Sequence, residues 1–471
     1  MNKEEKELWK KVKAFKLDSP KEDYGFSVKL SHENKWTIQF TEDAILEYKK
    51  FMFLAAISKS MVSPSHIIDV VWHQHLTFSH SYKSFCELLG KSINHIPSTG
   101  KVGEREVLKN AVNFTKEKYE KYFDKQNAII WSVKSFEDSI KLQQASKNWN
   151  LSNSQLILVG VLLLIPTFFL WKPILLKIGN PEFIQIAIMG LIFSIVFIEY
   201  FTREGFNNAY SSLVYDNEYI RKLKPEESIV IATRNTEQLA LYKLNNLFEN
   251  KLIETKRDST NLKKVNTTKK SEDVVENSIL NYVKENSKND LRVVLNEASN
   301  KPFLTRFLDT GEMIQKKIMN SKAIIEHKII ISFILFLLYS FLFSRFILGT
   351  LRDKPVLILM IFIVLSLVIF YVYLMDRYKV LYKRKFLSAI DTHVDTDQYL
   401  DGILLNQNVV LAGALTALII ASGYGPKKKE TSWFDSTWGS CSTCSTCSSC
   451  SSCSSCSSCS SCSSCGGCGG D

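Results

Sequence analysis

The chain alternates between segments of mixed polar pattern and a few long apolar runs. About 20 apolar residues are needed to cross the hydrocarbon layer of a bilayer. Four runs are candidate spans: 156–171, 183–198, 329–344 and 356–375. The fourth is long enough by itself, and the others reach this length if flanking polar side chains extend to the interface. Two closely spaced apolar pairs are difficult to bury in a soluble domain, so the pattern predicts an integral membrane protein.

The same pattern predicts a mainly α fold in which soluble and membrane segments alternate. A helical N-terminal domain precedes the first apolar pair, and a small α/β insert separates the two pairs. A short apolar segment after the second pair either spans the membrane or re-enters it, and the low-complexity tail is expected to be disordered. In order, the predicted segments are 1–131 (N-terminal domain), 132–154 (linker), 155–201 (transmembrane helix pair), 202–322 (insert), 323–375 (transmembrane helix pair), 376–407 (basic segment), 408–425 (candidate fifth membrane segment) and 426–471 (tail).

The apolar spacing within the soluble segments predicts local elements. In the N-terminal domain, apolar residues alternate with polar ones at 26–30 and again at 36–40, which is typical of half-buried strands. Ser63 followed by Pro64 is a signal for the start of a helix. In the insert, a helical pattern is followed by two β-like pieces at 252–255 and 262–265, an order that resembles a winged helix. The insert lacks a dense basic face, so we expect a docking module rather than a nucleic-acid partner.

Basic residues near the apolar runs predict the orientation in the membrane, because lysine and arginine favour the cytoplasmic side. Five of them lie within 376–385, directly after the fourth run, whereas the short loops inside the two pairs carry fewer. We therefore expect a multi-pass protein of the cell membrane, with the N-terminal domain and the insert in the cytoplasm. Contact of these basic flanks with the lipid bilayer accounts for the net charge of +11.

A cluster of histidines stands out in the N-terminal domain, where 69–86 reads DVVWHQHLTFSHSYKSFC. If 64–89 were one straight helix, Asp69 and His73 would share a face with His66, while His75 and Cys86 would point nearly the opposite way. The first group would resemble a facial arrangement of histidine and carboxylate ligands. Alternatively, residues 77–81 break the helix, and His75, Cys86 and the later His95 converge with His73.

The order of these residues resembles the signature of the glycine-rich-domain-containing protein family, over roughly residues 20–131. The motif of that family combines a W-H-x-H stretch with a tyrosine, a cysteine, a glycine and H-x-P. The matching positions here are Asp69, Trp72, His73, His75, Tyr82, Cys86, Gly90, His95 and Pro97. Phe85 and Asn94 depart from the pattern. The remainder resembles bacterial multi-pass membrane proteins with a tail rich in glycine and cysteine. Neither resemblance implies a known activity.

From these observations we expect a metal site or a purely structural cluster. For a metal site, the predicted ligands are His73, His75, Cys86 and His95, with Asp69 orienting an imidazole from outside the ligand set. Such ligands suit zinc or another soft divalent metal. Trp72 and Tyr82 are expected beside this cluster.

The tail places a cysteine at every third position. An extended polyproline II chain has three residues per turn, so these thiols would lie along one edge about 9 Å apart. Neighbouring thiols at that spacing cannot form disulfides without local folding, and the string suits soft metals, thiol exchange or cross-linking. A low-complexity tail without specific chemistry is the alternative. The residues are Cys441, Cys444, Cys447, Cys450, Cys453, Cys456, Cys459, Cys462, Cys465 and Cys468.

The sequence as a whole predicts a membrane-anchored binding or assembly protein with a protein partner or self-association. The first alternative is a metal- or thiol-dependent enzyme that uses Cys86, His73, His75 and His95. No nucleophile elbow, phosphate-binding glycine loop or H-E-x-x-H pattern supports it. The second alternative is a membrane-tethered DNA-binding regulator that uses the insert.

Overall fold

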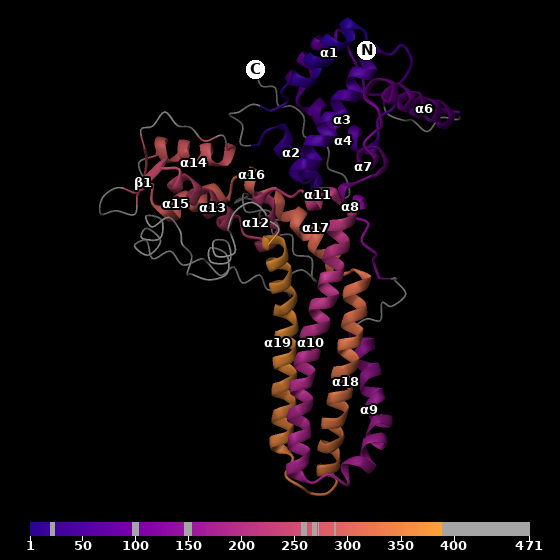
Figure 1. Ribbon diagram of the computed structural model, residues 1–471, viewed down its shortest axis with the longest axis vertical. Helices are drawn as coiled ribbons and strands as arrows, with labels where there is room; N and C mark the ends of the chain where they lie inside the picture. Colours follow the sequence, from indigo (N-terminus) through magenta and orange to yellow (C-terminus); the bar gives the residue numbers. More distant parts are fainter. Residues whose placement is uncertain are drawn as a thin grey trace, which may run out of the picture. The chain divides into compact units, whose positions relative to one another are not determined.

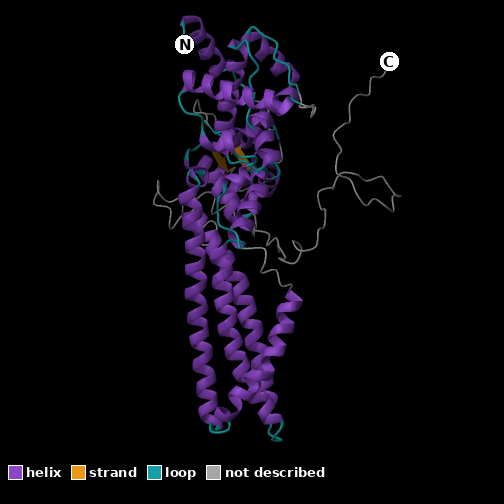
Figure 2. Ribbon diagram, turned by 90° about the vertical axis from the view of Figure 1, so that its right-hand side faces the viewer, coloured by secondary structure: helices purple, strands orange, loops and turns teal. Residues whose placement is uncertain are grey.

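The computed structural model describes residues 1–18, 24–96, 103–145, 153–255, 261–265, 271, 273–286 and 289–388, and these residues are mainly helical (Figures 1 and 2). The mainly α class predicted from the sequence is confirmed. The ten tail cysteines, the candidate fifth membrane segment and the end of the basic segment lie outside the described residues.

The N-terminal part consists of helices that pack around α3. Thr37 caps α3, where its hydroxyl accepts the backbone N–H of Phe40 at 3.3 Å. Phe40, Tyr48 and Phe51 recur at helical spacing and are essentially fully buried against α1, α2, α4, α6 and α7. The helices are α1 (Lys3–Ala14), α2 (Phe26–Asn34), α3 (Ile38–Ile57), α4 (His66–Thr77), α5 (Ser79–Leu89), α6 (Glu104–Phe123), α7 (Ala128–Ser132) and α8 (Phe136–Ser139).

The two strands predicted in this part are wrong. Residues 26–30 belong to helix α2, and 36–40 contain the cap and first turn of helix α3. Phe26 and Leu30 are both fully buried and are one helical turn apart, so the buried positions follow the helical period.

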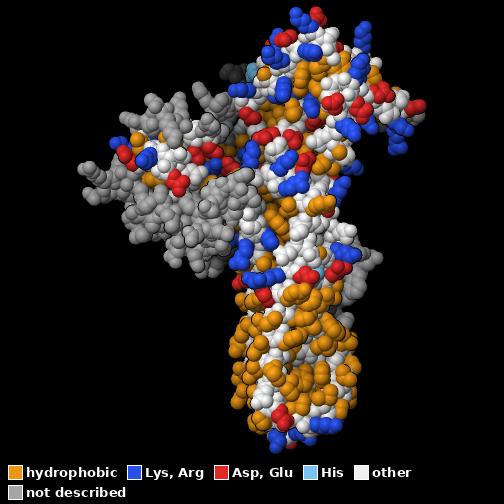
Figure 3. Space-filling view, in the orientation of Figure 1, with side chains coloured by type: hydrophobic (Ala, Val, Ile, Leu, Met, Phe, Trp, Pro, Cys, Tyr) orange, Lys and Arg blue, Asp and Glu red, His pale blue; other side chains and the backbone are white. Residues whose placement is uncertain are grey.

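Four long helices form the part that is rich in exposed apolar side chains: α9 (Asn153–Leu175), α10 (Asn180–Asp216), α18 (Lys322–Thr350) and α19 (Leu357–Ser388). Figure 3 shows apolar side chains covering this bundle, with charged side chains at its ends. Three of the helices, α10, α18 and α19, are long and apolar enough to cross a membrane. They contain the second, third and fourth predicted spans. In α9 the apolar stretch described is the shorter Leu162–Leu175, so the first span stays a prediction. These helices indicate a membrane protein.

The membrane helices are joined by close packing and by polar contacts at one end of the bundle. Helix α10 packs along α18, and a Cβ atom added at Gly205 would lie only 2.8 Å from Cγ of His327. The Arg345 guanidinium on α18 donates hydrogen bonds to the carbonyls of Leu175 at 2.8 Å and Ile178 at 3.2 Å, near the turn between α9 and α10. Arginine thus satisfies carbonyls that the end of α9 leaves without a helical partner.

The same helices are also joined near the other end of the bundle. Glu199 on α10 accepts hydrogen bonds from Tyr373 and Arg377 on α19. The apolar middle of the bundle therefore has a charged contact near each end.

The insert between α10 and α18 contains one β-hairpin and several short helices. The predicted strands are confirmed: β1 (Ile253–Thr255) pairs antiparallel with β2 (Leu262–Lys264), with Glu254 opposite Lys263. Helix α12 packs against α17 and α19. The helices are α11 (Glu218–Arg221), α12 (Pro225–Thr233), α13 (Thr236–Glu249), α14 (Val274–Glu285), α15 (Leu291–Ser299), α16 (Pro302–Thr305) and α17 (Phe307–Met319).

The insert contacts the N-terminal helices through a shared apolar core. The Phe40 ring lies 4.9 Å from that of Phe136 and 5.0 Å from that of Tyr219, measured between ring centroids. The backbone N–H of Ile38 donates to Oε1 of the fully buried Glu227 at 2.7 Å. Because Phe136 belongs to α8, part of the segment predicted as a linker, 132–154, is folded into this core.

Candidate functional site

Helix α4 supplies two of the three side chains that come together at the candidate site. Ser65, not Ser63, caps this helix, since its hydroxyl accepts the N–H of Ile68 at 3.3 Å. Asp69 and His73 follow four residues apart and therefore lie one turn from each other on the same helical face. The distance between His73 Nε2 and Asp69 Oδ2 is 3.5 Å.

The third side chain, His95, reaches the site because the chain turns twice. Helix α4 ends at Thr77, and Phe78 separates it from α5 with a φ of −90° and a ψ of 61°. Helix α5 then ends at Leu89, and Gly90 caps it with a φ of 69°, in the left-handed region that glycine adopts without strain. The segment after Gly90 returns to α4. The predicted helix break is thus real, and it brings His95 to His73.

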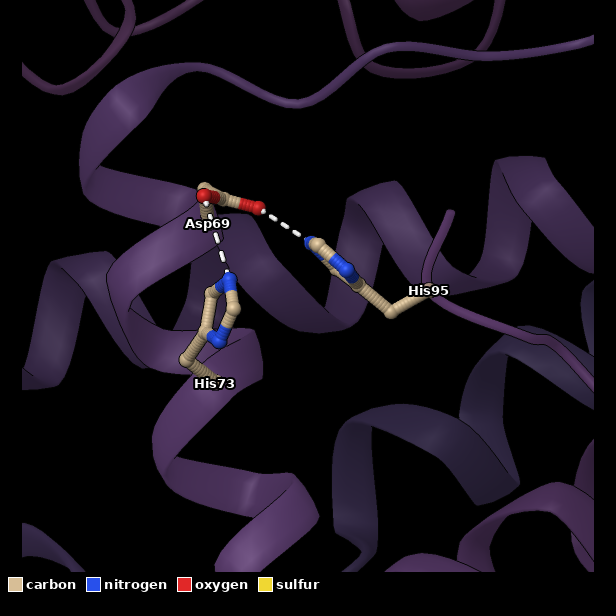
Figure 4. Close-up of side chains that lie close together, drawn as sticks. All are labelled: Asp69, His73 and His95. Atoms are coloured by element: carbon tan, nitrogen blue, oxygen red, sulfur yellow. Dashed lines mark hydrogen bonds and ion pairs between the residues drawn. The ribbon is translucent and has the colours of Figure 1, made fainter. Parts of the chain in front are cut away.

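Figure 4 shows both imidazole rings directed at the carboxylate of Asp69. His95 Nε2 lies 2.9 Å from Asp69 Oδ1, and the centroids of the two imidazole rings are 4.4 Å apart. One ligand-type atom from each of the three residues lies within 4.8 Å of the other two. Their side chains are 38% (Asp69), 59% (His73) and 17% (His95) exposed, so the group is open to solvent on one side.

This spacing fits a bound divalent metal ion. With metal–ligand bonds of about 2.1 Å, neighbouring ligand atoms lie about 3.0–3.4 Å apart in octahedral or tetrahedral geometry. The distances from His95 to Oδ1 and from His73 to Oδ2 of Asp69 are 2.9 and 3.5 Å, within about 0.1 Å of that range. Two imidazoles and one carboxylate on one side of an ion leave positions on the other side for water or another ligand. This donor set suits zinc and similar first-row metals.

The structure does not place His75 in this group. His75 is fully buried, with Nδ1 2.8 Å from the hydroxyl of Tyr48 and Nε2 3.0 Å from the hydroxyl of Ser81. Burial, together with the nearby charge of Lys49, lowers the pKa of His75 to about 4. Two residues along a helix differ in direction by about 200°, so His75 points into the core while His73 points outward. His75 is therefore a neutral core residue.

Cys86 is also outside the group. It lies on α5 as a half-buried free thiol beside Tyr82. The predicted set of four ligands, His73, His75, Cys86 and His95, is therefore not assembled among the described residues. Asp69 was expected to orient an imidazole from outside the ligand set. Its carboxylate lies instead between His73 and His95, as a member of the cluster itself. The spacing of four residues between Asp69 and His73 was the signal for this role.

Trp72 and Tyr82 lie beside the site, as expected. The indole N–H of Trp72 donates to the hydroxyl of Tyr82 at 3.1 Å, and the hydroxyl of Tyr82 donates to the carbonyl of Ile93. The rings of Trp72 and His95 meet edge to face, with centroids 4.7 Å apart. The indole of Trp72 is a donor only and cannot bind a metal, and the hydroxyl of Tyr82 is directed at the carbonyl of Ile93. His66 is exposed at the start of α4 and is not part of the group.

Comparison of the chain with family models, with curated proteins and with solved structures found no match. Fold and site define a mainly α-helical membrane protein with an open cluster of two histidines and one carboxylate.

Proposed function

We propose that this is a membrane-anchored binding protein whose N-terminal domain holds one divalent metal ion, zinc or a similar metal, through Asp69, His73 and His95. The observation that carries the proposal is the convergence of three ligand-type atoms within 4.8 Å, from segments 26 residues apart in sequence.

The membrane arrangement that we propose is multi-pass, with the N-terminal domain and the insert in the cytoplasm. Basic residues in 376–385 and ahead of α18 support this orientation. Reporter domains inserted after Lys222 and after Ser388 should both report a cytoplasmic position. Opposite positions for the two reporters would contradict the arrangement.

The metal proposal is tested on the full-length chain in lipid nanodiscs. All ten tail cysteines are replaced by serine, because thiolates bind the same metals. After incubation with zinc and dialysis, the protein should retain about one ion per chain. His73→Ala and His95→Ala should each lose most of the ion. His80→Ala is the matched control, since His80 is an exposed histidine on α5 outside the group.

Two outcomes would contradict the metal proposal. One is a folded protein that retains no stoichiometric metal. The other is equal retention in the parent protein, in His73→Ala and in His95→Ala. The native tail, compared with its serine version in the same assay, separately tests the predicted binding of soft metals by the tail thiols.

The two alternative functions have less support. A thiol-dependent enzyme would need a base beside Cys86, but His75 is paired with Tyr48 and Ser81 and has a lowered pKa. A DNA-binding role for the insert would need a basic face. In the hairpin, Lys263 lies 3.8 Å from Glu254, so its charge is balanced locally.

A further inference from the structure

We propose that the hydroxyl group of Tyr82, together with the indole N–H of Trp72, positions His95 for metal binding. This inference rests on the proposed metal site. His95 is the one member of the group that does not come from α4, so the site is complete only while the segment 91–96 stays against that helix. Two anchors hold this segment in place.

One anchor lies at the beginning of the segment. The ammonium group of Lys91 donates to the carbonyl of Ala55 at 2.9 Å and to that of Ser58 at 3.1 Å. These carbonyls belong to the last turn and the cap of α3, where carbonyl groups have no helical partner. The contact fixes the position of Lys91, but four residues separate it from His95, so it does not fix the imidazole.

The second anchor lies two residues before His95. The carbonyl of Ile93 accepts a hydrogen bond from the hydroxyl of Tyr82, and the side chain of Ile93 is buried. The hydroxyl of Tyr82 in turn accepts the indole N–H of Trp72 at 3.1 Å. Since the indole can only donate, the hydroxyl proton is directed at Ile93. Burial raises the pKa of Tyr82 to about 12, so this proton stays in place at neutral pH.

Trp72 connects this anchor to the other two metal ligands. It belongs to α4, between Asp69 and His73, and its ring meets the His95 ring edge to face at 4.7 Å between centroids. The hydrogen bonds from Trp72 to Tyr82 and from Tyr82 to Ile93 therefore hold the segment 91–96 against α4, the helix that carries Asp69 and His73. Tyr82 and Trp72 are positioning residues in this scheme, because neither touches the metal.

Removing the hydroxyl of Tyr82 leaves the carbonyl of Ile93 and the indole N–H of Trp72 without their partner. The segment 91–96 then keeps the Lys91 anchor but loses the hydrogen bond next to His95, so we expect the ion to lose one of its two imidazoles. Loss of outer partners at metal sites weakens binding about 10–100-fold. We expect Tyr82→Phe to weaken zinc binding at least about 10-fold.

The test compares variants of the full-length chain with the serine tail, in nanodiscs. Zinc affinity is measured by competition with a chromophoric chelator, and the number of imidazoles on zinc is measured by X-ray absorption. The parent protein should show two imidazoles and Tyr82→Phe one. Tyr122→Phe is the control: the hydroxyl of Tyr122 donates to Glu5 at 2.9 Å in the same domain, and its loss should leave both readouts unchanged.

Each outcome leads to a definite conclusion. Two imidazoles and unchanged affinity in Tyr82→Phe would overturn the positioning role and leave the proposed metal site intact. Absence of metal from the parent protein would overturn the proposed function and this inference with it. If Tyr82→Phe does not fold, Trp72→Phe is the second variant: it keeps an aromatic ring beside His95 but loses the indole N–H that donates to Tyr82, together with part of the buried ring. Its zinc should then lose the second imidazole as well.

Discussion

The buried imidazole of His75 makes the stability of the N-terminal helices depend on pH. In the folded protein its pKa is about 4, because burial disfavours the charged ring, whereas an unfolded chain has the ordinary value of 6.5. As the pH falls, the unfolded chain therefore takes up this proton first. The contribution of His75 to stability is complete above pH 6.5 and is lost progressively between 6.5 and about 4.

The size of the effect follows from the two pKa values. One pKa unit corresponds to about 1.4 kcal/mol. At pH 5 the unfolded chain is mostly protonated at this residue and the folded chain mostly neutral, so the free energy of unfolding falls by about 2 kcal/mol, or about 30-fold in the equilibrium constant. Opening of α4 should become more frequent by that factor.

Amide hydrogen exchange detects this change in the full-length protein in nanodiscs, with chelator present to remove metal. Exchange of peptides from α4, corrected for the intrinsic effect of pH, should be about 20-fold faster at pH 5 than at pH 7, because at pH 7 a minority of the unfolded chains is already protonated at His75. His75→Asn removes the titrating group and should abolish the difference, whereas the exposed His80→Asn should keep it. A difference that persists in His75→Asn, or is missing from the parent protein, would refute the reasoning.

Two further predictions concern the membrane helices. Gly205→Ala should lower the free energy of unfolding by about 1–3 kcal/mol, because the added methyl overlaps His327. Gly160→Ala is the control, since its new Cβ atom has nothing within 4 Å and the variant should change stability little; thermal unfolding in nanodiscs measures both. Arg345→Met should lower the free energy of unfolding by about 3 kcal/mol, because it removes hydrogen bonds to carbonyls at the α9–α10 turn. Arg352→Met, at an exposed position, should leave the stability unchanged, and equal melting temperatures for the two variants would contradict the stabilising role of Arg345.

Some elements could be predicted from the sequence because their signal is local. The apolar runs predict the long helices α10, α18 and α19, and two short β-like pieces predict the hairpin of the insert. The pattern at 26–30 failed because residues spaced i, i+2 and i+4 satisfy the strand period and also contain the i, i+4 pair of a helix. Burial of Phe26 and Leu30 in the tertiary core decides between the two, and that burial is not visible in five residues.

The candidate site could be predicted only in part for a similar reason. The pairing of Asp69 with His73 follows from helical spacing alone. The approach of His95 depends on the break at Phe78 and the turn at Gly90, which together fold the chain back over 26 residues. The prediction that His75 joins His73 depended on the helix break, but the break follows Thr77, so both histidines stay on α4 and point apart.

Helix α10 has a mechanical consequence. Its 37 residues span about 55 Å, whereas the hydrocarbon layer is about 30 Å thick, so about 25 Å of the same helix continues beyond the bilayer. That extension carries Phe206, Ala209 and Leu213 into the soluble core. Because the helix is continuous, a change in tilt moves this extension as well. A tilt change of about 10°, one response to a thinner or thicker bilayer, would displace the end of an extension of about 25 Å by about 4 Å. A tilt change of that size would displace the residues of the folded core that α10 carries by a similar distance.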